Sequence, residues 1–295
     1  MHWIVPFASA MSEGAHEALR RIDWKPLAAF DAGRRTGRDE WSLTPPHERA
    51  LAEAIGLEGA DGSLPWAARE AGRAGIDVGD RPFARLTPCH WHVGRDQVLM
   101  TDPATLELDE AESRALFDAL PSLFADDGIE VHHAATLCWY ATHADFDDLA
   151  CGSIDRAIGR AVDAWLPSGP GARRIRRLQS EVQMLWHTHP VNAAREARGL
   201  RPVNSFWIDG CGRAQPERAA EVRIDTRLRP PALAGDWAAW LLQWRALLDT
   251  IDASVHTLTL CGERFAQTCE RRERAWWQQL GRRTAAPDAA RLIEL

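Results

Sequence analysis

Histidines are the residues of this chain with the clearest capacity for chemistry. His90 and His92 flank a tryptophan in "HWH", so on a strand both imidazoles would lie on one face, where they could bind zinc. A zinc ion needs further ligands, and four other histidines are candidates if the fold gathers them: His132, His133, His187 and His189. The alternative is that these histidines are packed or hydrogen-bonded parts of the structure.

Arginines are clustered in "ARRIRR", at the start of a predicted helix. The helix dipole disfavours cations in the first turns, so a functional reading is an anion site for phosphate or carboxylate. The alternative is a solvated face on which Arg177 pairs with Glu181 at the i, i+4 spacing.

No catalytic nucleophile is predicted. Cys89 or Cys211 would need a neighbouring base, which the sequence does not place. Ser9, Ser12 and Ser42 stand in no nucleophile-elbow motif. We therefore expect no catalytic residue among them.

The composition is that of a globular protein, with 45% apolar and 26% charged residues among 295. The net charge of -7 argues against nucleic acid as a partner. No run of eighteen apolar residues predicts a membrane span, and the start "MHWIVPFASA" has no basic leader, so we expect a cytoplasmic protein. The six scattered cysteines are then expected to be reduced and buried.

Helices and strands are predicted from hydrophobic periodicity and from capping residues. Asp109 and Asp236 are expected to cap helices, Pro46 to begin one, and Pro190 to end one. A Gly-, Asp- and Pro-rich stretch, 72–88, is a plausible domain boundary. The predicted strands are 2–8, 89–102, 129–143 (one or two strands), 202–208 and 255–262. The predicted helices are 45–56, 109–128, 153–171, 172–189, 236–249 and 263–280, with a loose tail from Arg282.

The segment "HPVNAAREARGLRPVNSFWIDGCGR" carries the most specific motif. It resembles the His-Pro-Val-Asn, Arg, Gly-Leu-x-Pro-Ala-Asn, strand, Gly-x-Gly pattern of archaeal-type cofactor-independent phosphoglycerate mutases. In its full layout the chain is similar to proteobacterial RpfE-type regulatory proteins. The residues that match the mutase pattern are His189, Pro190, Asn192, Arg195, Gly199, Leu200, Pro202, Asn204, Gly210 and Gly212.

This resemblance implies an α/β fold, with an alkaline-phosphatase-like sheet flanked by helices and an inserted α+β subdomain. The expected bounds are 1–85 and 172–295 for the α/β domain, and 86–171 for the insertion. It also implies two divalent metals, manganese or zinc, and a serine that carries the phosphoryl group. The chain departs from the family where a metal-binding Asp-Gly should follow the first strand, because Pro6-Phe7-Ala8 stands there. The family's late histidine-containing ligand clusters have no counterpart after Arg213, where His256 is the only histidine.

Two-metal phosphoryl transfer depends on such ligands. We therefore predict a degenerate relative that needs no cofactor: a non-catalytic regulatory or metabolite-binding protein. Its expected ligand is a phosphorylated or carboxylated small molecule. The resemblance and the arginine cluster place it near six residues: His189, Asn192, Arg195, Asn204, Arg173 and Arg177.

Three alternatives stay open. The two asparagines could instead cap a helix and stabilise turns. The chain could be an active mutase or phosphatase with relocated manganese or zinc ligands, such as His90 and His92 or the His187/His189 pair. Its tryptophan-rich helices could form a surface for a protein partner.

Overall fold

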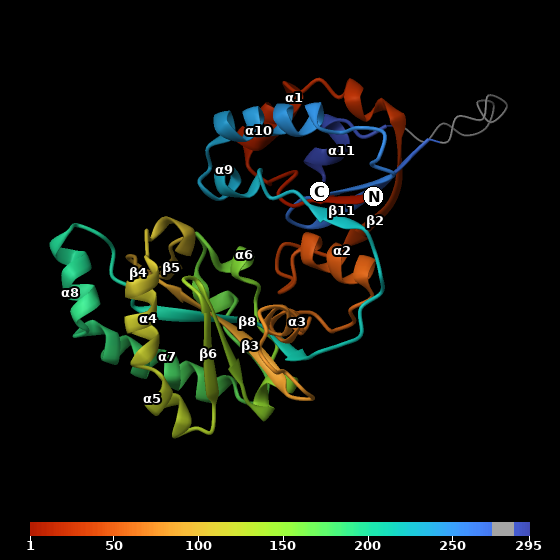
Figure 1. Cartoon of the computed structure of the whole chain (residues 1–295). Coiled ribbons are helices and arrows are strands. Elements are labelled where there is room, and N and C mark those ends of the chain that lie inside the picture. Colours follow the sequence, from red (N-terminus) through yellow and green to blue (C-terminus); the bar gives the residue numbers. More distant parts are fainter. Residues whose placement is uncertain (273–285) are drawn as a thin grey trace. The chain divides into compact units, whose positions relative to one another are not determined.

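The computed structural model describes residues 1–272 and 286–295 and divides into two compact units (Figure 1). Unit 1 consists of Met1–Gly56 and Glu217–Leu295, and unit 2 is the continuous segment Leu57–Pro216. The boundaries of these units differ from the predicted domain boundaries. Residues 85 and 86 lie within a strand of unit 2, and residue 172 begins a helix that packs on the same sheet, so neither position separates two cores.

Unit 1 contains a five-stranded sheet in the order β2-β11-β10-β1-β9. β1 lies between β9 and β10 and is parallel to both, while β11 is antiparallel to its two neighbours, β10 and β2. The strands are β1 (His2–Val5), β2 (Phe30–Gly37), β9 (Val222–Ile224), β10 (Thr257–Cys261) and β11 (Phe265–Arg271).

The side chains of β1 alternate between two apolar cores, because successive residues of a strand point to opposite faces. Trp3 and Val5 pack in a core that includes α1 and α10, whereas Ile4 packs near α2. Figure 1 shows α1 and α10 on one face of this sheet and α2 on the other. The helices of unit 1 are α1 (Glu13–Arg20), α2 (Pro46–Ile55), α9 (Arg229–Leu233), α10 (Trp237–Asp249) and α11 (Ala289–Ile293), with a 3-10 turn at Lys25–Ala29.

Unit 2 contains a four-stranded antiparallel sheet in the order β6-β7-β3-β8, and a separate hairpin formed by β4 and β5. The longest pair joins β3 to the edge strand β8, so residues more than a hundred positions apart in the sequence pair with each other, with one register shift between Phe83 and Arg85. The strands are β3 (Pro82–Cys89), β4 (Trp91–Val93), β5 (Val98–Met100), β6 (Glu130–Ala135), β7 (Cys138–Thr142) and β8 (Ser205–Arg213).

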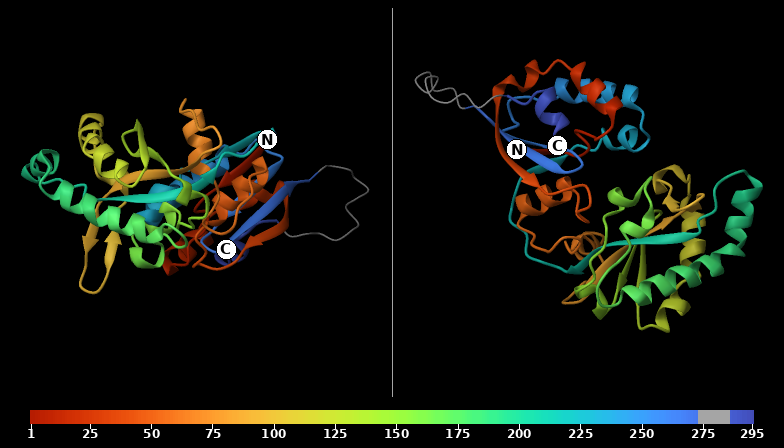
Figure 2. Two further views of the ribbon diagram at one scale, coloured as in Figure 1. Left: turned by 90° about the horizontal axis from the view of Figure 1, so that it is seen from below. Right: turned by 180° about the vertical axis from the view of Figure 1, so that it is seen from behind.

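Helices cover both faces of the unit 2 sheet. Phe83 of β3 packs against the alanines of α3, whereas its neighbours Ala84 and Leu86 join a larger core with α4 and α7. The two views in Figure 2 show α7 lying along this second face. The helices of unit 2 are α3 (Trp66–Arg73), α4 (Glu110–Asp118), α5 (Pro121–Ala125), α6 (Ile154–Ala157), α7 (Ala172–His187) and α8 (Pro190–Ala197). Short 3-10 turns lie at Pro103–Thr105, Ala144–Asp147 and Val162–Ala164.

The fold class predicted from the sequence is confirmed: mixed α/β, with sheets flanked by helices. Asp109 and Asp236, the two residues predicted to cap helices, are confirmed as caps. Asp109 caps α4 in a reciprocal capping box with Glu112, Asp236 caps α10, and Gly56 ends α2 with a left-handed φ of 80°.

Three predicted elements were wrong. The helix predicted over 153–171 stops at Ala157, because the next residues bridge to β5 and the Gly159 N–H donates to the Met100 carbonyl (2.8 Å). Residues 265–271 of the helix predicted over 263–280 form β11, which is held between β10 and β2. Its residues 273–280 lie outside the described part of the chain. The described end of the tail, 286–295, forms α11 and buries Leu295.

Two further predictions concern the chain as a whole. All six cysteines are free, and all but Cys138 are buried. Within residues 1–272 and 286–295, no helix has the length and apolar character needed to cross a bilayer.

Candidate functional site

The two Pro-Val-Asn tripeptides form a pair of matching backbone clamps. The Asn192 amide accepts a hydrogen bond from the Val203 N–H (2.8 Å) and donates to the Val203 carbonyl (2.8 Å). The Asn204 amide does the same to Trp91, accepting from its N–H (2.7 Å) and donating to its carbonyl (2.9 Å). Asn192 also donates to the Trp186 carbonyl at the end of α7 (2.8 Å). The Asn192 clamp therefore joins the segment just before β8 to the end of α7. The Asn204 clamp joins the same segment to the β4–β5 hairpin.

Arg195 is fully buried and bonded within the protein. Its guanidinium donates to the main-chain carbonyls of Arg201 (Nε, 2.9 Å) and Leu106, and pairs with the Glu112 carboxylate. Glu112 also pairs with Arg198. A buried guanidinium needs such partners, and here they hold α8 against α4.

The arginine cluster of α7 is divided by the faces of the helix. Arg177 pairs with Asp127 and lies 3.8 Å from Glu181, as the solvated-face alternative expected. Arg174 pairs with Asp127 and Asp145. Arg173 is exposed. Within the part of the chain that the structure describes, the Arg176 guanidinium forms no ion pair, and it lies at the edge of a pocket.

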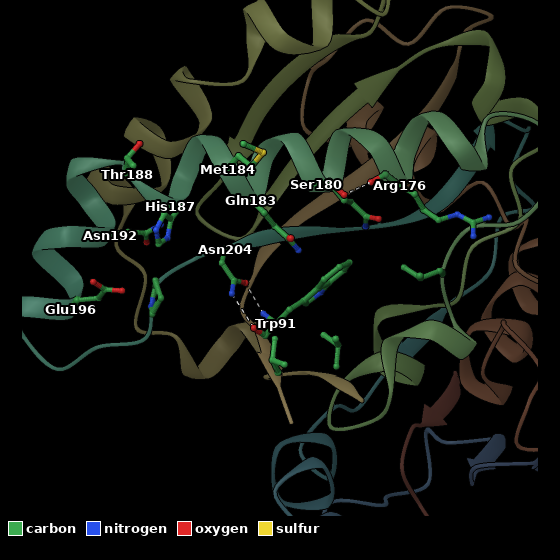
Figure 3. Close-up of a pocket in the computed structure, with 15 residues that line it drawn as sticks. Trp91, Arg176, Ser180, Gln183, Met184, His187, Thr188, Asn192, Glu196 and Asn204 are labelled. Carbon is green, nitrogen blue, oxygen red and sulfur yellow. Dashed lines mark hydrogen bonds between the residues drawn. The ribbon is translucent and has the colours of Figure 1, made fainter. Parts of the chain in front are cut away.

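This pocket, called here the α7 pocket, has a volume of about 920 Å³ and lies between α7, α8 and the β4–β5 hairpin (Figure 3). One wall consists of apolar side chains, among them the half-buried Trp91 indole, which extends from the hairpin toward α7 in Figure 3. Val93 and Met184 stand on the pocket lining with 77% of their surface exposed. The remaining apolar lining comes from Val98, Leu166 and Pro202.

The opposite wall is a polar stripe along α7. α7 buries Ile175, Leu178, Val182 and Trp186 against the sheet, at intervals of three and four residues. The residues one position later repeat the same intervals, so they share a second face. That face lines the pocket with Arg176, Gln179, Gln183 and His187, and the neighbouring Ser180 lines it as well.

Gln179 is the most enclosed polar group of the stripe, with 2% of its surface exposed. Its amide nitrogen donates to the Phe206 carbonyl of β8 (3.1 Å), which leaves the amide oxygen as an acceptor at the pocket lining. Within the described chain that oxygen has no hydrogen-bond partner, and neither does the Gln183 amide. The pocket therefore offers unused hydrogen-bonding groups beside an apolar wall.

Of the predicted ligand residues, Asn192 and Asn204 reach the lining of the α7 pocket, with their amides engaged in the clamps. Arg195 lies in the core, and the Arg177 guanidinium is held by carboxylates. The sequence interpretation missed Trp91, Arg176, Gln179 and Gln183. Three of these residues could have been recognised in the sequence. Arg176, Gln179 and Gln183 each follow a residue of the apolar stripe of 172–189 by one position, so they form a second, polar stripe at helical spacing.

The histidines proposed as metal ligands have separate surroundings. His92 and His187 are exposed. Burial lowers the pKa of His90, His133 and His189, which favours their neutral form. Among the residues that the structure describes, no group of three or more His, Cys, Asp or Glu side chains is arranged to hold a metal ion. The other contacts are His90 with the Pro202 carbonyl (2.8 Å), His132 stacked on Phe83 (centroids 6.1 Å apart), His133 with the Ser113 hydroxyl (3.1 Å), and His189, whose ring accepts from the Val191 N–H (3.3 Å) as the cap of α8.

The end of β1 does not suit a metal of the kind the resemblance implies. Phe7 follows the strand in a left-handed conformation (φ 57°), and its carbonyl accepts a hydrogen bond from the Trp240 indole (3.0 Å). Its ring packs against the imidazole of His47, 5.7 Å between centroids. Divalent cations of this type need oxygen or nitrogen ligands, whereas here a phenyl ring follows the strand and the carbonyl oxygen of the same residue already accepts a hydrogen bond.

Sequence comparison gives the relatives of the chain. It is 25% identical over 231 residues to a probable 2,3-bisphosphoglycerate-independent phosphoglycerate mutase of Geobacter sulfurreducens, covering 72% of this chain and 56% of that protein. A mutase of Methanothrix thermoacetophila is 31% identical over 67 residues, which is 23% of this chain and 17% of that protein. The chain is homologous to cofactor-independent phosphoglycerate mutases.

The chain spans about half the length of the Geobacter sulfurreducens protein. No model of a protein family matches it. Among solved structures, a cofactor-independent phosphoglycerate mutase from Thermoplasma acidophilum aligns over 100% of this chain and 95% of its own, with 13% identity and a TM-score of 0.38. A protein from Pyrococcus horikoshii aligns over 99% and 90%, with 10% identity and a TM-score of 0.41.

Proposed function

We propose that this mutase homologue is a non-catalytic, cytoplasmic protein of the RpfE-type regulatory group. It binds a phosphorylated or carboxylated small molecule in the α7 pocket and needs no metal to do so. The observation that carries the proposal is the Arg176 guanidinium, which has no ion-pair partner in the described chain and borders a pocket with unused amide groups. An arginine is well suited to a carboxylate or phosphate, because its planar donors match two oxygens.

The binding site in this proposal is moved from the six residues expected from the sequence. In this proposal Asn192 and Asn204 do not bind the ligand; their hydrogen bonds keep the walls of the pocket in place. Arg195 keeps α8 in place in the same way. Arg176 takes the place expected for Arg173 and Arg177, because it is the arginine that lines the pocket. Since the whole chain carries a net charge of -7, binding of an anion depends on this local positive charge and should weaken as salt is raised.

Two assays on the purified full chain test the proposal. The first measures conversion of 3-phosphoglycerate to 2-phosphoglycerate with manganese supplied, beside an active mutase. The second measures calorimetric binding of 3-phosphoglycerate to the wild type, Arg176→Ala and Arg173→Ala. We expect no turnover, and a loss of roughly tenfold in affinity for Arg176→Ala, at the low end of the about 1.5–3 kcal/mol for hydrogen bonds to charged groups.

Arg173→Ala is the matched control, since it removes an exposed arginine from the same helix outside the pocket. Equal loss of affinity in both variants would contradict the site. Turnover that a chelator abolishes would contradict the non-catalytic proposal, and would favour an active mutase or phosphatase with relocated manganese or zinc ligands.

A further inference from the structure

The α7 pocket is large and has one apolar and one polar wall, and both features indicate the class of ligand that it binds. At about 920 Å³ it lies at the upper end of the about 300–1,000 Å³ typical of pockets for drug-sized ligands. Arg176 and His187 stand eleven residues apart on one helix, which corresponds to about 16 Å at 1.5 Å per residue. One small anion bound at Arg176 would leave the rest of this stripe unused.

The middle of the pocket is suited to a flat ring. The Trp91 indole is half-buried and extends into the space beside α7 (Figure 3), and within the described chain no other ring or cation is stacked on it. The clamp from Asn204 fixes its main chain through two hydrogen bonds. A bound ring that stacks on such a held indole gains affinity at little cost in side-chain entropy.

The groups facing Trp91 are suited to the edge of a nitrogen heterocycle. The Gln179 amide oxygen is an acceptor held in place by the bond from its own nitrogen to Phe206. The Gln183 amide offers both a donor and an acceptor, as the edges of nucleobases require. Glu196 lines the pocket near the His187 end, so negative charge is favoured at the Arg176 end and disfavoured at the other.

From these three features we infer that the α7 pocket binds a nucleoside phosphate. Its base stacks on Trp91 and bonds to the amides of Gln179 and Gln183, and its phosphate lies at Arg176. This inference rests on the anion site proposed above and adds the class of molecule that carries the anion.

Calorimetry on the full chain with adenosine 5′-monophosphate and ribose 5-phosphate tests the inference. The two probes share the sugar and phosphate and differ in the base. We expect the nucleotide to bind about 5- to 150-fold more tightly, the range that stacking of one base on an aromatic side chain provides. Trp91→Ala should remove this advantage and leave the binding of ribose 5-phosphate unchanged, which also shows that the variant is folded.

Trp41→Ala is the control for loss of a tryptophan, because Trp41 is 66% exposed and belongs to unit 1. Trp91→Phe keeps a ring in place and should retain most of the advantage. Equal affinity for the two probes, or an advantage that survives Trp91→Ala, would overturn the inference while leaving the anion site intact. If neither these probes nor 3-phosphoglycerate binds, the anion site itself is overturned.

Discussion

The paired asparagine clamps allow one comparison of stability that the structure determines closely. Asn192 and Asn204 are the only asparagines in the chain, and each grips both main-chain groups of one residue. Both line the α7 pocket, but Asn192 is only 3% exposed, whereas Asn204 is half-buried. Substitution to alanine therefore removes the same pair of clamp bonds at a nearly buried position and at a half-buried one, and at Asn192 it also removes the bond to the Trp186 carbonyl.

The expected costs follow from whether water replaces the lost amide. In Asn192→Ala the buried Val203 N–H and carbonyl both lose a partner, and each such group costs about 1–3 kcal/mol. The Trp186 carbonyl keeps the bond from the His189 N–H (3.1 Å). For the two groups together we expect a loss of about 2–6 kcal/mol. In Asn204→Ala water can bond to Trp91, so the loss should be about 1–2 kcal/mol.

Urea unfolding followed by far-ultraviolet circular dichroism measures both losses by linear extrapolation. The clamp explanation would be refuted if Asn204→Ala cost as much as Asn192→Ala, or if Asn192→Ala cost less than about 1 kcal/mol. A loss of nucleotide or 3-phosphoglycerate binding in Asn204→Ala, with stability nearly retained, would agree with its place at the hairpin wall of the pocket.

Three further predictions concern other contacts. Phe7→Gly should be more stable than Phe7→Ala by about 1 kcal/mol in thermal unfolding, because both lose the ring and only alanine keeps a Cβ at φ 57°; equal stability would contradict this. Arg195→Ala should cost about 3–5 kcal/mol, the range for breaking a buried pair, and a change below 1 kcal/mol in urea unfolding would show that the pair is dispensable. Burial lowers the pKa of His189 in the folded state, so the unfolded chain binds more protons just below the ordinary value of 6.5, and stability should fall as the pH drops through that window. His189→Ser keeps a side chain that can cap α8 but has no titrating ring. The midpoint of urea unfolding should therefore depend less steeply on pH between about 7.5 and 5 in this variant than in the wild type. An unchanged slope would show that His189 is not the source of the pH dependence.

Local signals in the sequence predicted the elements that local chemistry decides. Asp109 with Glu112 marked the start of α4, and Pro190 marked the place where α7 must end. Each of these residues acts on backbone groups within four positions of itself. Such elements can be predicted from one sequence.

Elements that depend on distant partners were predicted poorly. The segment "FAQTCER" carries charges and alanine that suit a helix, and it forms β11 because β10 and β2 pair with it on either side. β2 itself, "FDAGRRTG", has no clear strand pattern. Strand propensity is set by burial and neighbours, which the sequence alone does not supply.

The candidate site shows the same limit at the scale of single side chains. The arginine cluster was recognised as a possible anion site, but choosing Arg176 over Arg173 and Arg177 requires the rotation of α7 about its axis. That rotation follows from Ile175, Leu178, Val182 and Trp186 packing on the sheet. Leu185, three residues after Val182, is 37% exposed, whereas Trp186, four residues after Val182, is buried.

The interrupted course of unit 1 has a consequence for synthesis on the ribosome. β1 is made long before its partners β9 and β10, which begin at Val222 and Thr257. At about 5–20 residues per second, the apolar strand waits on the order of 10–40 s for its first partner. Unit 2 is continuous and complete at Pro216, so it can fold while β1 is still unpaired. The nascent chain therefore carries an unpaired apolar strand after unit 2 is complete, and such a segment is the kind that chaperones bind during translation.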